Sequence, residues 1–512
     1  MSGPSRSPVD RRPLVVVGDV LLDIDLDGVA RRLSPEAPVP VISGATERRR
    51  PGGAALAALL ASRLHPDVVL IAALADDTAA AEVTRLLSGR VRVIAVPWGG
   101  TTSVKTRLRA GGHAVTRLDT GGDPGQVGAL PDAARQVLRA AEAVLVADYG
   151  LGCTSDEGVR AALAVAARRT PLVWDPHPRG APPIAGARLV TPNESEAAGY
   201  LPDVTGTGLA AATRRAAGLV ELWGAGAVAL TLGARGALLS YGVGAPSLLP
   251  AAAVHADDTC GAGDAFAAAA TAALGRGLLP SEAVAEAVRY AAGFVAAGAA
   301  ATLVPGEMGA GQGVAASGLT RTLPARAGAD LAAELDGDLV SKALVDAEPA
   351  AEVDLAYPAL EQVRAVGGRI VATGGCFDLL HAGHVDMLEA ARALGDALVV
   401  CLNSDDSVRR LKGASRPVQR QEDRARILAA LRCVDAVVVF EEDTPETVLG
   451  RLRPDLWVKG GDYGGADLPE ARVVASWGGQ VLTLPYLTGR STSDLVETVR
   501  RRQAGQDEVT GP

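Results

Sequence analysis

The sequence predicts an α/β protein that contains two doubly wound, mainly parallel sheets of unequal size. Apolar runs rich in β-branched residues alternate with alanine-rich helical patterns along most of the 512 residues, which is typical of βαβ units. The alternation stops near residue 305 and begins again at residue 369. Because the chain is too long for one ordinary core, we expect a large first domain over residues 1–310 and a smaller second domain over residues 366–512.

The strands of the first domain are expected at five apolar runs. In chain order these runs are PLVVVGD from residue 13, DVVLIAAL from 67, AVLVADYG from 143, PLVWDP from 171 and AVALTLG from 227. Segments of helical pattern separate them, so we expect successive strands to run parallel.

A segment of different composition lies between the two domains. Residues 311–365 begin with a stretch rich in Gly, Ser, Thr and Pro and continue into a stretch that suits one or two helices, which predicts a partly helical linker. From residue 369 the runs RIVATGG, GDALVVCLNSD, DAVVVF and GQVLTLPY predict the strands of a Rossmann-like second domain.

Charge and cysteine usage narrow the class of protein. A formal net charge of −9 argues against a nucleic-acid-binding surface. The five cysteines are scattered and contain no C-x-x-C pair, so neither a disulfide framework nor a zinc knuckle is expected. No apolar stretch is long enough to span a bilayer, and we expect a cytoplasmic protein with no membrane or nucleic-acid partner.

The segment DTCGAGD, residues 258–264, predicts a phosphate cradle. Gly261 and Gly263 lack the Cβ atoms that would keep a phosphoryl group away, and a helix that starts there directs its first N–H groups at an anion. Asp264 at the helix start is placed to accept a proton from an attacking hydroxyl. Read alone, the four residues GAGD also fit a simple turn with a capping aspartate.

Together with its neighbours this segment resembles the signature of the ribokinase-like sugar kinases, which have a doubly wound sheet with a β lid. RPGGAALAAL (50–59), VTPNESE (190–196) and GDVLLD (18–23) resemble other motifs of that family. The resemblance implies that Asp264 is the catalytic base and that Mg²⁺ and ATP are used, with Glu196 near the metal. It also assigns the nucleotide to Asn193, Glu194, Ser195, Glu196, Thr231, Gly233, Gly261, Ala262 and Gly263, and the sugar to Asp19, Asp23, Gly52 and Gly53. Leu56 stands where that family has an asparagine, which puts one sugar-hydroxyl contact in doubt.

The segment TTSVKTRLR, residues 101–109, places cations at alternate positions of an expected lid strand. Lys105 and Arg107 therefore share one face and can bind the phosphate of a sugar phosphate. An edge strand kept soluble by its charges would show the same pattern.

Two histidines mark the start of a helix in the second domain. His381 and His384 follow the strand RIVATGG, where the helix dipole and imidazole N–H groups can converge on a phosphate. A zinc site on one helix face, or two histidines that cap a surface helix, are the other interpretations of the pair.

The wider segment GCFDLLHAGH (375–384) resembles the signature of the cytidylyltransferase-like nucleotidyltransferases. RSTSDLV (490–496) resembles their second signature, and VKGGDY (458–463) contains Lys459 in a glycine-flanked loop. The resemblance implies that His381, His384 and Lys459 stabilise the phosphates of a nucleoside triphosphate. It assigns further nucleotide contacts to Gly375, Phe377, Asp378, Ser491, Thr492 and Ser493.

Both halves in this order resemble the bifunctional heptose kinase/adenylyltransferases of ADP-heptose synthesis. The resemblance implies ATP-dependent phosphorylation of heptose 7-phosphate at O1, then adenylyl transfer to heptose 1-phosphate after a separate phosphatase has removed the 7-phosphate. A homodimer through the kinase lid is implied as well. Two alternatives stay open: a kinase for another sugar fused to a cytidylyltransferase, and a sugar-nucleotide sensor without activity.

Overall fold

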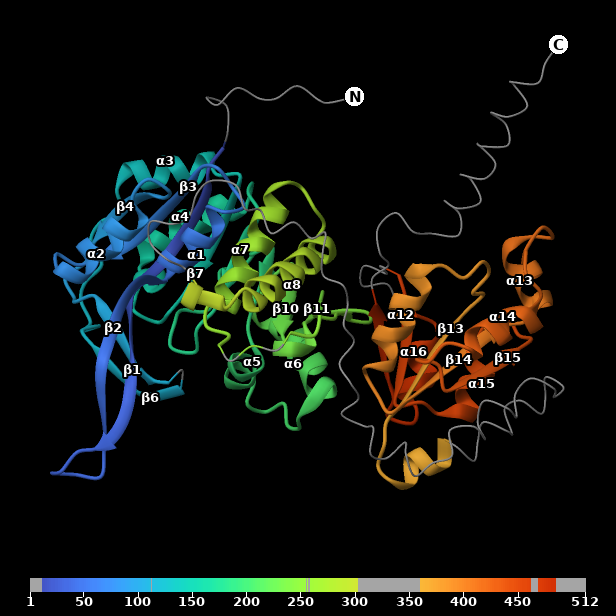
Figure 1. The fold of residues 1–512 in the computed structure, drawn as a ribbon. Coiled ribbons are helices and arrows are strands. Elements are labelled where there is room, and N and C mark those ends of the chain that lie inside the picture. Colours follow the sequence, from blue (N-terminus) through green and yellow to red (C-terminus); the bar gives the residue numbers. More distant parts are fainter. Residues whose placement is uncertain are drawn as a thin grey trace, which may run out of the picture. The chain divides into compact units, whose positions relative to one another are not determined.

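The computed structural model describes residues 12–111, 113–254, 256, 258–302, 360–461 and 468–484. Backbone contacts divide the chain into two compact units, residues 1–242 with 249–322, and residues 243–248 with 323–512 (Figure 1). Residues 303–359 lie outside the described part, so the predicted boundary near 310 and most of the predicted linker stay predictions. Residues 360–365 are helical, and Leu360 packs into the core of the second unit.

The first unit is built on a sheet of eight strands that are parallel except for the last pair. Each predicted run forms a strand of this sheet, because its apolar side chains are buried on both faces. In spatial order the strands are β4 (Arg92–Pro97), β3 (Val68–Leu74), the first part of β1 (Leu14–Leu33), β7 (Ala143–Ala147), β8 (Leu172–Asp175), β9 (Leu189–Val190), β10 (Val228–Thr231) and β11 (Ala237–Ser240).

Helices cover the sheet. Leu14 and Val16 of β1 belong to one core with three alanine-rich helices, whereas Val15 and Val17 point to the opposite face and are equally buried. The helices of that core are α1 (Ala54–Ala61), α7 (Ala262–Gly275) and α8 (Pro280–Ala296). The other helices of this unit are α2 (Thr78–Leu87), α3 (Asp132–Ala140), α4 (Glu157–Ala167), α5 (Glu194–Tyr200) and α6 (Gly208–Trp223). Short 3₁₀ turns lie at Cys153–Ser155, Gly233–Arg235 and Ala299–Thr302. The strand β12 (Ser247–Leu249) begins within residues 243–248, which are grouped with the second unit.

A second, smaller sheet forms the predicted lid of the first unit. The second part of β1 leaves the central sheet and pairs with β2 (Pro40–Gly53) and with β5 (Ser103–Ala110), and β5 pairs in turn with β6 (His113–Thr120). The ends of β1 and β2 extend well beyond the helices of this unit (Figure 1). Because β5 lies between β1 and β6, the interpretation of Lys105 and Arg107 as residues of a solvated edge strand is wrong.

The second unit has a five-stranded parallel sheet. Its spatial order is β15 (Ala436–Phe440), β14 (Ala397–Asn403), β13 (Ile370–Gly375), β16 (Leu456–Gly460) and β17 (Gln480–Leu484). Numbered along the chain this order is 3-2-1-4-5, so the direction of winding reverses at β13, and ligands bind at such a switch point beside the carboxyl ends of the strands. The helices are α12 (Ala382–Arg392), α13 (Asp405–Lys412), α14 (Gln421–Ala429), α15 (Glu446–Leu452) and α16 (Glu470–Ala475).

Two further features concern the cysteines and the apolar character of the helices. All five cysteines are free. Among the described residues, no helix is both long and apolar enough to cross a membrane.

Candidate active sites

Asp264 lies in the first turn of α7, as its position after a glycine-rich turn predicts. Gly261 caps the helix with φ of +83°, a left-handed conformation that glycine adopts without strain. Asp264 is 7% exposed, and its Oδ1 accepts a hydrogen bond of 2.6 Å from the hydroxyl of Tyr149. Burial raises the pKa of Asp264 to about 7, although the Tyr149 hydrogen bond acts in the opposite direction. A carboxylate with this pKa is suited to accept a proton at neutral pH.

The start of α7 leaves room for an anion. A Cβ atom added to Gly263 would meet no atom within 4 Å, whereas one added to Gly261 would come within 3.0 Å of Leu56 Cδ2. Leu56 is 2% exposed and packs against the glycine turn. Its side chain has no polar atom, so position 56 cannot form a hydrogen bond to a sugar hydroxyl. The N–H of Ala262 is already bonded to the carbonyl of Thr259. Any anion at the cradle therefore depends on the other N–H groups of the first turn.

The basic face of the lid converges on Asp23. Arg107 Nη1 lies 2.7 Å from Asp23 Oδ1, and Arg50 Nη1 lies 3.3 Å from Asp23 Oδ2. A Cβ at position 52 would lie 2.6 Å from Asp23 Oδ2, so any other residue here would have to displace the carboxylate that the two arginines hold. The Lys105 ammonium lies 5.7 Å from the centre of the Tyr149 ring, and burial lowers the pKa of this lysine. Lys105 and Asp264 thus both contact Tyr149, and Asp23, which Arg107 and Arg50 hold, lies close enough for its charge to interact with both of them.

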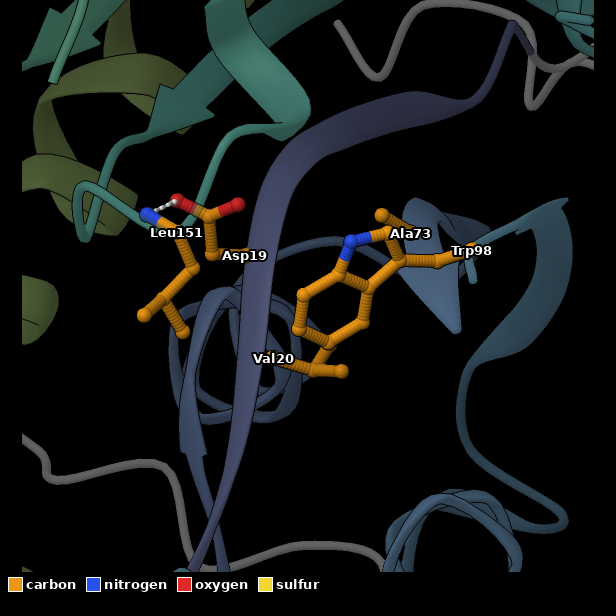
Figure 2. Close-up of a pocket in the computed structure, with 5 residues that line it drawn as sticks. All are labelled: Asp19, Val20, Ala73, Trp98 and Leu151. Carbon is orange, nitrogen blue, oxygen red and sulfur yellow. Dashed lines mark hydrogen bonds between the residues drawn. The ribbon is translucent and has the colours of Figure 1, made fainter. Parts of the chain in front are cut away.

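Asp19 holds a loop in place. Its carboxylate accepts hydrogen bonds from the backbone N–H groups of Tyr149 at 3.1 Å, Leu151 at 3.0 Å and Cys153 at 2.9 Å. Figure 2 shows Asp19 facing Leu151 in a narrow pocket, lined also by Val20, Ala73 and Trp98, that has no room for a water molecule. These contacts favour a positioning role for Asp19 over the predicted direct contact with the sugar.

The segment NESE begins α5 with a reciprocal cap. The Asn193 side chain accepts from the Glu196 N–H at 2.9 Å, and the Glu196 carboxylate accepts from the Asn193 N–H at 2.8 Å. Glu194 pairs with Arg235 at 2.7 Å, and Ser195 is exposed. Thr231 bridges to Asn193, so the segments that contain Asn193 and Gly233 are neighbours at the ends of β9 and β10.

Three residues of this site escaped the sequence analysis, namely Tyr149, Arg50 and Asp175. Burial, Glu196 and Asp264 raise the pKa of Asp175 well above its usual value, which indicates that three carboxyl groups share one region. Tyr149 and Asp175 both follow or end buried parallel strands, and that position is the sequence signal that could have found them.

In the second unit, His381 and His384 stand at the N-terminus of α12 as predicted. Their rings stack with centroids 3.9 Å apart, and Phe377 lies 5.3 Å from the His384 ring. His384 Nδ1 accepts from the His381 backbone N–H at 3.4 Å, which assigns the proton of a neutral ring to Nε2. Burial, helped by His381 and Lys412, lowers the pKa of His384 to about 4. His384 is therefore a neutral hydrogen-bond donor at pH 7.

Lys459 lies on β16, next to β13, at the same carboxyl edge of the sheet. The register pairs Thr373 with Val458, so Lys459 is level with the strand end that leads to the histidines. Its ammonium contacts Glu470, a residue that is only 3% exposed. Within the described parts of the chain, no group of three or more His, Cys, Asp or Glu side chains is placed to hold a metal ion.

Asp378 is buried, and its carboxylate binds the loop of residues 416–419. It pairs with Arg416 at 2.6 Å and accepts from the N–H groups of Val418 at 3.0 Å and Gln419 at 3.2 Å. These hydrogen bonds lower its pKa, although burial acts against them. These contacts favour a positioning role for Asp378, and its predicted nucleotide contact stays a prediction. Gly375 ends β13 beside Phe377, while the predicted Ser491, Thr492 and Ser493 lie outside the described residues.

Arg424 on α14 forms hydrogen bonds to several segments at the carboxyl edge of the second sheet. Arg424 is 1% exposed, and its side chain donates to the carbonyls of Cys376, Asn403 and Gln419 and to the carboxylate of Asp405. The sequence gives no sign of this burial, because an arginine within QEDRARILA is typical of an exposed helix face.

Each half of the chain matches a known protein family, and similar proteins match nearly its whole length. Residues 11–306 match the pfkB family of carbohydrate kinases, and residues 372–474 match the cytidylyltransferase-like family. A relative from Streptomyces coelicolor, "Bifunctional protein HldE", is 52% identical over 97% of this chain and 98% of its own. Another protein of that name, from Azorhizobium caulinodans, is 38% identical over 95% and 98%. The structure of Arabidopsis thaliana ribokinase complexed with ribose and ATP covers 56% of this chain and 92% of its own, at 22% identity and a TM-score of 0.44.

Fold, site and matches define a bifunctional enzyme, a carbohydrate kinase joined in one chain to a nucleotidyltransferase. More narrowly, the chain belongs to the family of bifunctional HldE proteins.

Proposed function

We propose that the first unit phosphorylates D-glycero-D-manno-heptose 7-phosphate at O1 with ATP, and that the second unit transfers an adenylyl group from ATP to heptose 1-phosphate. The products of the second step are ADP-heptose and pyrophosphate. The observation that carries the proposal is the meeting of lid cations and a near-neutral carboxylate around Tyr149, which suits a phosphorylated sugar that must lose a proton.

In the kinase step the hydroxyl at O1 of the sugar gives its proton to Asp264 and attacks the γ-phosphorus of ATP, while the bond from that phosphorus to the bridging oxygen breaks and ADP leaves. Lys105 and Arg107 bind the 7-phosphate, and Asp23, held by Arg107 and Arg50, accepts from a sugar hydroxyl. The first turn of α7 faces the transferred phosphoryl group.

The residues near the nucleotide fit a magnesium ion. Glu196 and Asp175 provide carboxylate oxygens, and Mg²⁺ in such sites needs only one or two protein carboxylates besides water and phosphate oxygens. When bound, Mg²⁺ neutralises charge on the phosphates of ATP. Asn193 and Glu196 keep the start of α5 in a fixed geometry through their reciprocal cap.

In the adenylyl transfer an oxygen of the sugar phosphate attacks the α-phosphorus of ATP, and pyrophosphate leaves on the opposite side. His384 donates its Nε2 proton in a hydrogen bond to a phosphate oxygen, and Lys459 binds phosphate charge from β16. A separate phosphatase removes the 7-phosphate between the two steps, so the intermediate leaves the protein.

The lid is also the proposed interface of a homodimer. Every residue of β6 is exposed, and the lid carries five exposed apolar side chains, Val29, Leu33, Val39, Val115 and Leu118. Surfaces of this kind are commonly covered by a second copy. Light scattering that gives the monomer mass would contradict this interface. A cytoplasmic location stays a prediction.

Mass spectrometry of the products tests the whole proposal. Heptose 7-phosphate, ATP and Mg²⁺ should yield heptose 1,7-bisphosphate, and ADP-heptose should appear only after a 7-phosphatase is added. Product formed from CTP in preference to ATP would favour the cytidylyltransferase alternative. If no transfer occurs with either sugar phosphate and either nucleotide, the sensor alternative gains support.

A further inference from the structure

Tyr149 connects the lid of the first unit to the carboxyl group at the start of α7. Its hydroxyl donates to Asp264 Oδ1 at 2.6 Å, and its ring lies beneath the Lys105 ammonium at 5.7 Å. The backbone N–H of Tyr149 is bonded to Asp19 on β1, so the position of the ring is fixed from the central sheet. One side chain therefore contacts a lid cation and the expected base.

We propose that Tyr149 is a positioning residue of the kinase reaction, which holds Asp264 with one oxygen directed at the substrate hydroxyl and supports Lys105 against the sugar phosphate. This inference rests on the kinase function proposed above and deepens it. Tyr149 belongs to the run AVLVADYG, which the sequence analysis used only to place a strand.

The hydrogen bond selects which carboxylate oxygen does the chemistry. Because Oδ1 accepts from Tyr149, the proton of the attacking hydroxyl goes to Oδ2, and the new O–P bond forms as the γ-phosphoryl group leaves ADP. Tyr149 keeps its own proton throughout, since burial and the charge of Asp264 raise the pKa of the phenol well above 10. The phenol is thus a permanent donor and never a competing base.

The same hydrogen bond favours the ionised form of Asp264 and counteracts burial. Lys105 and Arg50 act in the same direction, whereas the charge of Asp23 acts against it. Asp175 also lies close enough for its carboxyl group to interact with Asp264. Loss of the Tyr149 hydroxyl alone should therefore raise the pKa of Asp264.

Tyr149→Phe in the full-length protein separates the two contacts, because it removes the hydroxyl and keeps the ring under Lys105. We expect kcat for sugar phosphorylation at pH 7 to fall about tenfold, the scale of one hydrogen bond to a charged group. The acid limb of the profile of kcat against pH should move to higher pH, and KM for the sugar phosphate should stay unchanged. Tyr149→Leu removes both contacts and should raise that KM as well.

Tyr290→Phe is the matched control, because it removes a partly buried phenol on α8 that is not bonded to Asp264. Its profile should match that of the unaltered protein. Adenylyl transfer, which takes place in the other unit, should be unchanged in every variant, and circular dichroism checks that the first unit remains folded.

A ¹³C titration of labelled aspartate carboxyl groups gives a readout that does not depend on turnover, with the Asp264 signal assigned from its loss in Asp264→Asn. An unchanged Asp264 pKa in Tyr149→Phe would overturn the inference, as would an acid limb that does not move. Should Asp264→Asn phosphorylate heptose 7-phosphate at the normal rate, the proposed base is wrong. An inactive Asp264→Asn with an unmoved Tyr149→Phe profile removes only the role of Tyr149.

Discussion

Burial shifts the pKa of a key ionisable group at the candidate site of each unit, and the same physical cause has opposite chemical consequences. Burial disfavours charge, so it raises the pKa of Asp264 to about 7 and lowers the pKa of His384 to about 4. The carboxyl group becomes poised to exchange a proton near neutral pH. The imidazole becomes a donor that does not titrate there. Burial thus gives the first site a group suited to proton transfer and gives the second site a fixed hydrogen-bond donor.

His384→Ala tests the fixed donor and should have the largest effect. Removal of a single donor aimed at developing charge usually costs about 10² to 10³ in rate, so adenylyl transfer to heptose 1-phosphate should fall by that factor. Phosphorylation of heptose 7-phosphate, measured on the same protein by ADP release, should be unchanged. Wild-type adenylyl transfer in this variant would contradict the role of His384.

Asp264→Asn tests the proton acceptor and should have the mirror-image effect. The amide keeps the size of the side chain and removes the base, so kinase turnover should fall by about 10² or more. Adenylyl transfer from supplied heptose 1-phosphate serves as the control and should remain near wild type. If this variant loses both activities while circular dichroism shows a folded protein, the two sites are not independent.

Lys105→Ala and Arg107→Ala test whether the lid cations near Asp264 bind the phosphate of the sugar substrate. Each variant should raise KM for heptose 7-phosphate about tenfold, the cost of roughly one charge-assisted hydrogen bond, with little change in KM for ATP. Arg85→Ala, which removes an exposed cation of α2 that pairs with Glu82, provides a matched loss of charge outside the lid. Equal changes for both substrates would remove Lys105 and Arg107 from the sugar site.

The pH dependence of the two activities sharpens the comparison further. Asp264 must be ionised to accept a proton, so the kinase rate should fall about tenfold per pH unit below pH 7 and level off above it. Because His384 stays neutral above pH 5, it should add no inflection to adenylyl transfer between pH 6 and 9. An inflection near pH 6.5 that disappears in His384→Ala would show that His384 is charged at neutral pH.

Local patterns in the sequence predicted most of the architecture and part of each site. Strand runs, the helix start at Asp264 and the histidine pair depend on neighbours within a few residues, and the structure places them as predicted. The contacts of Asp19 and Asp378 join residues far apart in the chain; Asp19 and Tyr149, for example, are 130 positions apart. Such long-range partners decide whether a carboxylate accepts hydrogen bonds from backbone N–H groups or is open to a ligand. The periodicity of the sequence carries no information about these partners.

The buried guanidinium of Arg424 has a consequence for how this family can vary. Its donors serve three separate segments, namely the loop after β13, the last residue of β14 and the loop that precedes α14, so an insertion at any of them would displace contacts in the other two. Lysine cannot replace it, because a single ammonium cannot span the same planar set of acceptors. Loop lengths at this edge should therefore change together in descendants of this sequence, and a graft of one loop from a relative should succeed only when the other two are transferred with it.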